Sequence, residues 1–172
     1  VLTFVAFPDG FATVSIALHV PLTIMLIGIV LRGVALVFRN YDSRRSDVQE
    51  NWSRVFEVGS IVSPLMLGMS VGAIASGQIR ADAPEDAMWV WLQPFPMAVG
   101  GLTLAIFTYL AAVYLTVATW ETPDLQEDFR GRGLVASGVV FCLAWLAFFL
   151  AKSGAPMIWS GLWSASLAVP FQ

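Results

Sequence analysis

Four long apolar stretches constrain this chain more than any other feature of its sequence. They cover residues 11–31, 58–74, 94–119 and 134–151. Each comes close to or exceeds the run of about 20 mostly apolar residues that a helix needs to cross a bilayer. Because lipid offers no partner to a free amide or carbonyl, such stretches are expected to be helical. The sequence therefore predicts an all-α, polytopic transmembrane helix bundle, with residues 1–172 in a single domain.

The composition excludes a soluble enzyme. Hydrophobic residues make up 58% of the 172 residues and charged residues only 12%, whereas soluble domains are about 45–50% apolar and about 25% charged. One core of this size cannot bury the excess, which therefore has to face lipid. No basic run indicates nucleic-acid binding. The chain begins at Val1 without a basic leader, so we interpret it as an internal piece of a longer protein, in which residues 157–172 are compatible with the start of a fifth helix.

Basic residues are distributed unevenly between the connections. The connections 32–57 and 120–133 hold seven of the nine Lys and Arg residues, and they lie on the same side of a four-helix zigzag. The other side has Arg80 and Lys152. Because cytoplasmic loops carry an excess of Lys and Arg, residues 32–57 and 120–133 are predicted to be cytoplasmic loops. Both ends of the chain are then predicted to lie outside.

The two longer connections carry signals of their own. Ser46 and Gln49 fit the first and last positions of a capping box. Apolar residues follow at helical spacing: Val48, Trp52, Val55 and Phe56. We predict a short interfacial amphipathic helix before the second span. In the outer connection, Trp89 and Trp91 are typical of the aromatic belt at a membrane surface.

Small residues mark the expected contacts between helices, because they let helix backbones approach closely. These residues are Gly68 with Gly72 in the second span, the Gly100-Gly101 pair, and Gly133 with Ser137. Prolines near membrane depth should bend or start helices. They are Pro21, Pro64 and Pro96.

The four spans contain few side chains that could bind a cofactor or transfer a proton. Apart from Cys142, expected to be a small buried side chain, their one ionisable residue is His19. An intramembrane ionisable residue is a functional hypothesis by default, but a haem held by two histidines needs a second one, which the chain lacks. Ligation by His19 with a methionine or a partner's residue stays open, and a hydrogen bond to a neighbouring helix is favoured. No catalytic, cofactor-binding or metal-binding residue is predicted in this chain.

Three charged residues at the membrane boundary are candidates for a proton inlet or for assembly. Arg32 lies where the first span meets the cytoplasmic interface, and Arg39 follows about two helical turns later. This pair either stops transfer and binds lipid headgroups or lines a polar inlet. Glu57 lies at the start of the second span, where a carboxylate also suits a helix N-terminus electrostatically.

The first cytoplasmic loop resembles a known family. Residues 32–39, Arg-Gly-Val-Ala-Leu-Val-Phe-Arg, are similar to the Arg-Gly-Val-Ala-Phe-(acid)-Phe-Arg signature of subunit II of cytochrome bd-type quinol oxidases. Further matches follow in order: Gly59-Ser60, Pro64-Leu65, Gly68 and Gly72, then Pro94-Phe95 with Gly100-Gly101, then Tyr114-Leu115-Thr116 leading to Arg130 and Arg132. The acidic signature position is Val37 here, and the family's first two helices and C-terminal half are absent.

The resemblance implies a haem-free accessory subunit in the plasma membrane of a prokaryote. The haems and the quinol site are then expected in the partner, subunit I, which oxidises quinol and reduces oxygen to water. This chain would support assembly and proton or oxygen access, with Arg32 as the best inlet candidate and Arg39 as its neighbour. Membrane lipids and a quinone are further candidate partners. The alternatives are a small secondary transporter or channel-like protein with proline-bearing helices, and a self-sufficient membrane cytochrome, against which the single histidine argues.

Overall fold

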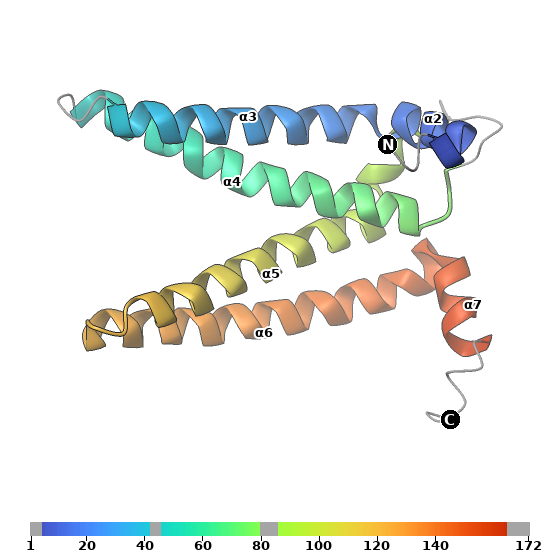
Figure 1. The fold of residues 1–172 in the computed structure, drawn as a ribbon. Helices are drawn as coiled ribbons and strands as arrows, with labels where there is room; N and C mark the ends of the chain where they lie inside the picture. Colours follow the sequence, from blue (N-terminus) through green and yellow to red (C-terminus); the bar gives the residue numbers. More distant parts are fainter. Residues whose placement is uncertain (1–4, 42–45, 80–85, 165–172) are drawn as a thin grey trace.

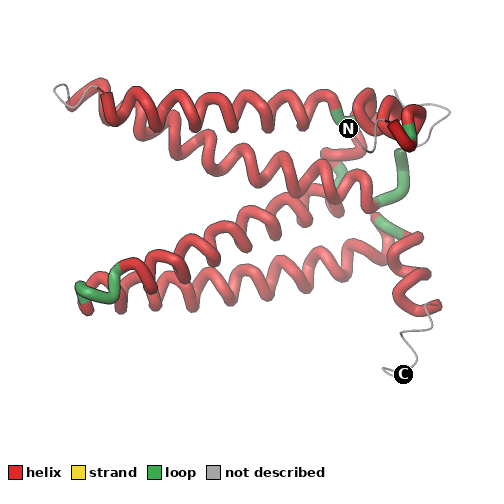
Figure 2. The backbone as a smooth tube through the Cα atoms, viewed as in Figure 1, coloured by secondary structure: helices red, strands yellow, loops and turns green. Residues whose placement is uncertain are grey.

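The computed structural model describes residues 5–41, 46–79 and 86–164, and the regular structure in these ranges is helical (Figure 1, Figure 2). Four long helices dominate: α3 (His19–Tyr41), α4 (Ser46–Ala75), α5 (Pro94–Ala118) and α6 (Pro123–Gly154). Three short helices are α2 (Pro8–Ala17), the 3-10 helix η1 (Asp86–Leu92) and α7 (Pro156–Ser164). The four long helices are long and apolar enough to cross a membrane. The predicted all-α membrane bundle is confirmed.

The first predicted span begins too early. Helix α2 ends at Ala17, Leu18 leaves the helical conformation, and the apolar part of α3 runs from His19 to Phe38 instead of over residues 11–31. Pro21 supplies the physical reason, because a proline ring inside a continuous helix would clash with the carbonyl four residues earlier, that of Ala17. In the first turn of a new helix the missing amide of Pro21 leaves no hydrogen bond unmade.

The predicted cytoplasmic loops 32–57 and 120–133 are mostly helical. Helix α3 continues to Tyr41, and α4 begins at Ser46, so the predicted short interfacial helix is the first part of α4 and not a separate element. Helix α6 begins at Pro123, well before the predicted start at residue 134. Hydropathy marks where a chain leaves lipid, whereas a helix continues until a break in its backbone hydrogen bonding. Residues 42–45 and 80–85, with Arg44, Arg45 and Arg80, lie outside the described residues, as do the side chains of the capping box before Gln49.

The four long helices form two hairpins, α3–α4 and α5–α6, which are joined by the contact between α4 and α5. Helix α3 contacts α4, α4 contacts α5, and α5 contacts α6. Figure 1 shows that the α3–α4 and α5–α6 pairs converge near η1 and α7 and diverge at the opposite end. The ends of α3 and α5 both lie at this diverging end, as the zigzag predicted. We call it the arginine end, because Arg54, Arg130 and Arg132 lie near it.

The contact between α4 and α5 depends on glycine. A Cβ atom added at Gly68 would lie 2.8 Å from the Cα atom of Gly100, and one added at Gly72 would lie 2.7 Å from the Cα atom of Pro96. Real Cβ atoms do not come this close to backbone atoms, so only glycine fits at Gly68 and Gly72. This confirms the prediction that the two glycines mark a contact between helices. Gly101, in contrast, has no neighbour within 4 Å of an added Cβ.

A second close approach joins α3 to α4. A Cβ atom added at Gly59 would lie 2.8 Å from the carbonyl oxygen of Gly28, and one added at Gly28 would lie 2.7 Å from the Oγ atom of Ser63. The sequence analysis missed this pair. Gly28 has no small partner four residues away, but Gly59 and Ser63 form in α4 the small-residue step typical of a packing face, so part of the signal was present in the sequence.

The converging end contains the main cluster of buried side chains. Its members come from the end of α2 with the following Leu18, from α4 and from η1: Ala17, Leu18, Met69, Ala73, Ala87, Val90 and Trp91. Trp89 is 66% exposed, as a tryptophan of an interfacial belt should be, but Trp91 is only 7% exposed. The belt interpretation is therefore wrong for Trp91. With about three residues per turn in a 3-10 helix, residues two apart point to different sides, and one tryptophan is turned into the core.

We predict that Gly68→Ala destabilises the full-length protein by about 1–3 kcal/mol, because the added methyl group would overpack the contact between α4 and α5. The matched control is Gly138→Ala in α6, where an added Cβ meets nothing within 4 Å. There the better helix propensity of alanine leaves stability unchanged or slightly raised. Thermal unfolding of the two variants in the same detergent makes the comparison. Equal melting temperatures would contradict the proposed role of the glycine contact.

Candidate functional site

A groove of about 480 Å³ opens between α3, α4 and α5 where the hairpins begin to diverge. We call it the inlet groove. Its lining is mostly apolar but includes one cation and three hydroxyl side chains. The lining residues are Met25, Ile29, Arg32, Ser60, Ile61, Ser63, Pro64, Leu67, Leu104, Phe107, Thr108 and Ala111. Because one water takes up about 30 Å³ in the liquid, the groove has room for a chain of water molecules.

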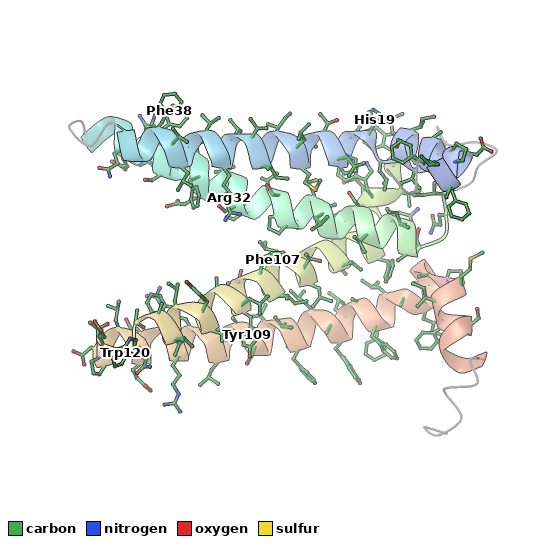
Figure 3. The ribbon with its side chains drawn as sticks, viewed as in Figure 1. His19, Arg32, Phe38, Phe107, Tyr109 and Trp120 are labelled. Carbon is green, nitrogen blue, oxygen red and sulfur yellow. The ribbon has the colours of Figure 1, made fainter. Side chains whose placement is uncertain are left out.

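Arg32 is the charged residue of the inlet groove. It lies within α3, not at its end, and its guanidinium carbon is 5.3 Å from the centre of the Phe56 ring in α4. In Figure 3 Arg32 and Phe107 both point into the opening between α4 and α5. The side chain is exposed, and a cation over an aromatic face is attracted by the ring quadrupole. The stem of Arg32 is thereby held against α4, and its charge faces the groove.

Three hydroxyl groups extend the polar lining inward. Ser60 donates to the Phe56 carbonyl at 2.7 Å, Ser63 to the Gly59 carbonyl at 2.7 Å, and Thr108 to the Leu104 carbonyl at 2.9 Å. Each oxygen can still accept a hydrogen bond. Pro64 adds one more polar atom, since it has no amide to donate to the Ser60 carbonyl one turn earlier. These groups together can hydrogen-bond water along the groove.

The three predicted site residues, Arg32, Arg39 and Glu57, do not all line the inlet groove. Arg32 lines the inlet groove, but Glu57 does not. Glu57 is exposed in the middle of α4, eleven residues after the helix begins at Ser46. The interpretation of Glu57 as a carboxylate at a helix N-terminus is therefore wrong, because that effect fades within the first turn. Arg39 belongs to the last part of α3, and its side chain lies outside the described residues.

The remaining predicted residues have simpler roles. His19 begins α3, and its Nδ1–H donates to the carbonyl of Ile16 at 2.8 Å, a local bond three residues back along the chain that spans the break at Leu18. Figure 3 shows His19 on the outer side of α3. Cys142 is exposed, so the prediction that it is buried is wrong. The reason is that only 6% of the residues in the most apolar stretch of α6 are buried against the other described helices.

The described residues contain no group of three or more His, Cys, Asp and Glu side chains that could hold a metal ion. Sequence reasoning found Arg32 but missed the hydroxyl groups beside it. A usable signal was present in the spacing of Ser60 and Pro64, which places both on one face of a helix. The contribution of Thr108 from α5 depends on how the two hairpins cross, which local sequence does not encode.

Comparisons with known proteins agree on one family. A family model described as cytochrome bd terminal oxidase subunit II matches residues 1–171. The curated protein "Cytochrome bd ubiquinol oxidase subunit 2" of Bacillus subtilis (strain 168) is 31% identical over 147 residues, which cover 84% of this chain and 42% of that relative. The chain thus spans less than half the length of this relative. No solved structure matches the chain.

We predict that a cysteine replacing Thr108 in the inlet groove reacts with a small, water-soluble thiol reagent added on the side of the arginine end. The reaction requires the thiolate and therefore water. A matched cysteine replaces Leu110, which is 55% exposed and does not line the groove. It lies at nearly the same depth, about 3 Å away along the helix. Both variants carry Cys142→Ser, and equally slow labelling of the two positions would show that the groove is dry.

Proposed function

The chain belongs to the cytochrome bd terminal oxidase subunit II family, and from this membership we propose that it is a haem-free accessory subunit of a quinol-oxidising terminal oxidase. In this proposal a haem-bearing subunit I oxidises quinol and reduces oxygen to water in the plasma membrane of a prokaryote. The present chain stabilises that partner and admits water and protons from the arginine end. The observation that carries the proposal is the family match over nearly the whole chain.

The haem-free part of the proposal rests on the residues. The chain has one histidine, so it cannot supply a pair of histidines to one haem. The haems and the quinol site are accordingly assigned to the partner subunit, and this chain is given no catalytic residue.

The inlet groove gives this subunit a physical task. Reduction of oxygen to water consumes protons, and a proton crosses an apolar region only along water or side chains that can exchange it. Arginine side chains act as hydrogen-bond donors and not as proton relays, so Arg32 is not assigned to the relay itself. It instead holds water at the mouth, from which the hydroxyl oxygens of Ser60, Ser63 and Thr108 continue the hydrogen-bonded path. The fixed positive charge of Arg32 opposes an excess proton nearby, which favours hydration over proton storage as its role.

The exposed side of α6 suits association with other membrane helices. Its large apolar side chains include Phe141, Trp145 and Phe149, which are 69%, 57% and 60% exposed. The rings of Phe141 and Trp145 stack with 6.3 Å between their centres, and the ring of Phe149 meets that of Trp145 edge to face at 5.5 Å. The transporter alternative gains no support from Pro64, because α4 continues through it as one helix. The break at Leu18 lies before the apolar span of α3, which runs unbroken from His19 to Phe38.

Deleting the gene for the full-length protein should abolish quinol-dependent oxygen consumption by isolated membranes, and the wild-type gene should restore it. In the restored strain we predict that Arg32→Leu lowers either the turnover per haem or the yield of assembled oxidase. The replacement removes the charge that holds water at the mouth and the contact with Phe56.

The matched control is Arg54→Leu, which removes an arginine near the same end. Its guanidinium pairs with Glu50 at 2.6 Å, and both side chains are largely exposed, so that pair is worth at most about 1 kcal/mol. Arg54→Leu should leave turnover and yield within error of the wild type. Wild-type turnover and yield in Arg32→Leu would remove Arg32 from the site, whereas normal respiration after gene deletion would refute the oxidase assignment itself.

A further inference from the structure

A second groove of about 800 Å³ runs between α5 and α6, next to the inlet groove. We call it the lipid groove. It shares Leu104 and Thr108 with the inlet groove but draws most of its lining from α6. The α6 residues are Glu127, Asp128, Gly131, Arg132, Val135, Ala136, Val139 and Leu143. The α5 residues are Gly101, Leu104, Ala105 and Thr108.

The chemistry of the lipid groove changes along its length. Charged side chains of both signs, Glu127, Asp128 and Arg132, lie at the arginine end. Beyond Arg132 the α6 lining is entirely apolar and ends at Leu143. A ligand that fits must therefore have a head carrying both charges and a long apolar tail.

The length of the apolar part matches one leaflet of a membrane. Arg132 and Leu143 are about 16 Å apart along the axis of α6, from a rise of about 1.5 Å per residue. Half of a hydrocarbon core of about 30 Å is about 15 Å. An acyl chain whose head lies level with Arg132 would therefore end near Leu143, close to the middle of the bilayer.

Small residues make room for such a chain. An added Cβ would meet nothing within 4 Å at Gly101 or at Gly131, so neither glycine is needed for the contacts between the described helices. Glycine weakens a helix relative to alanine, so these positions call for another explanation. An acyl chain lying in the groove next to them supplies one.

The charges indicate which headgroup fits. The guanidinium carbon of Arg132 lies 6.0 Å from the centre of the Phe129 ring. The ion pairs among the described residues join Glu50 to Arg54 and Glu127 to Arg130, so Arg132 and Asp128 are not paired with each other. A phosphate can face Arg132 while an ammonium group faces Asp128. A purely anionic head would be repelled by the Asp128 carboxylate, and a neutral quinone head would leave that carboxylate without an ion-pair partner among the described residues.

We propose that the lipid groove binds one phospholipid with an amine-bearing zwitterionic headgroup, of the phosphatidylethanolamine type, from the leaflet at the arginine end. The phosphate is held by Arg132 and the ammonium by Asp128. One acyl chain follows Val135, Ala136 and Val139 to Leu143. An ammonium with N–H donors suits carboxylate acceptors better than a quaternary choline, which has none.

The test uses the full-length protein in its purified complex, stripped of lipid and titrated with defined lipids under native mass spectrometry. The probes are phosphatidylethanolamine, phosphatidylcholine and phosphatidylglycerol with identical acyl chains. The wild type should bind one phosphatidylethanolamine more tightly than either other lipid. Arg132→Gln should weaken that binding on the order of tenfold, by loss of a charge-assisted hydrogen bond. Asp128→Asn should shift the preference toward phosphatidylglycerol, and it remains informative if Arg132→Gln fails to assemble.

Steric variants test the tail. Ala136→Phe places a ring in the groove and should abolish binding of the lipid. The matched control is Ala144→Phe, the same change at an exposed position of α6 that does not line the groove, and it should bind as the wild type does. Equal binding of the three lipids, or unchanged binding in Ala136→Phe, would overturn the proposal. So would release of a quinone instead of a phospholipid by Ala136→Phe, or cross-links showing that another helix of the complex fills the groove.

Discussion

The lack of water in the hydrocarbon core of a membrane is the constraint on which this structure depends. Each backbone amide must find its carbonyl within its own helix, so the helices are held together by side-chain packing and close backbone approach. Gly68, Gly72 and Gly100 provide that approach where α4 crosses α5. This contact joins two hairpins that otherwise diverge, and the position of the inlet groove between α3, α4 and α5 follows from it.

The diverging end gives two neighbouring grooves different chemistry. The inlet groove combines one cation with hydroxyl groups that can hold water, whereas the lipid groove combines charges of both signs with a long apolar floor. Thr108 lines both grooves. A lipid seated in the second groove would therefore also help to close the first against the surrounding membrane and keep its water in place.

Sequence reasoning recovered the features that depend on the membrane itself. The lengths of the apolar stretches predicted the four long helices, and the alternation of spans placed the ends of α3 and α5 on one side. It failed where helices extend beyond lipid. The capping box marked a helix start at Ser46, but hydropathy did not show that this helix continues into the second span as one element, α4. This error led directly to the misplaced role of Glu57. The break at Leu18 could have been predicted from Pro21. The contact of Gly28 with Gly59 depends on how the helices pack in three dimensions. The same is true of the position of Thr108, which lines both grooves.

The most direct test of the account is the visible absorption spectrum of the affinity-tagged full-length protein, purified in mild detergent and then separated from its partner. The account predicts that haem bands accompany the intact complex and stay entirely with the partner subunit after separation. Haem bands that remain with this chain, or a purified chain that never brings a haem-bearing partner with it, would contradict its assignment as a haem-free subunit of a terminal oxidase.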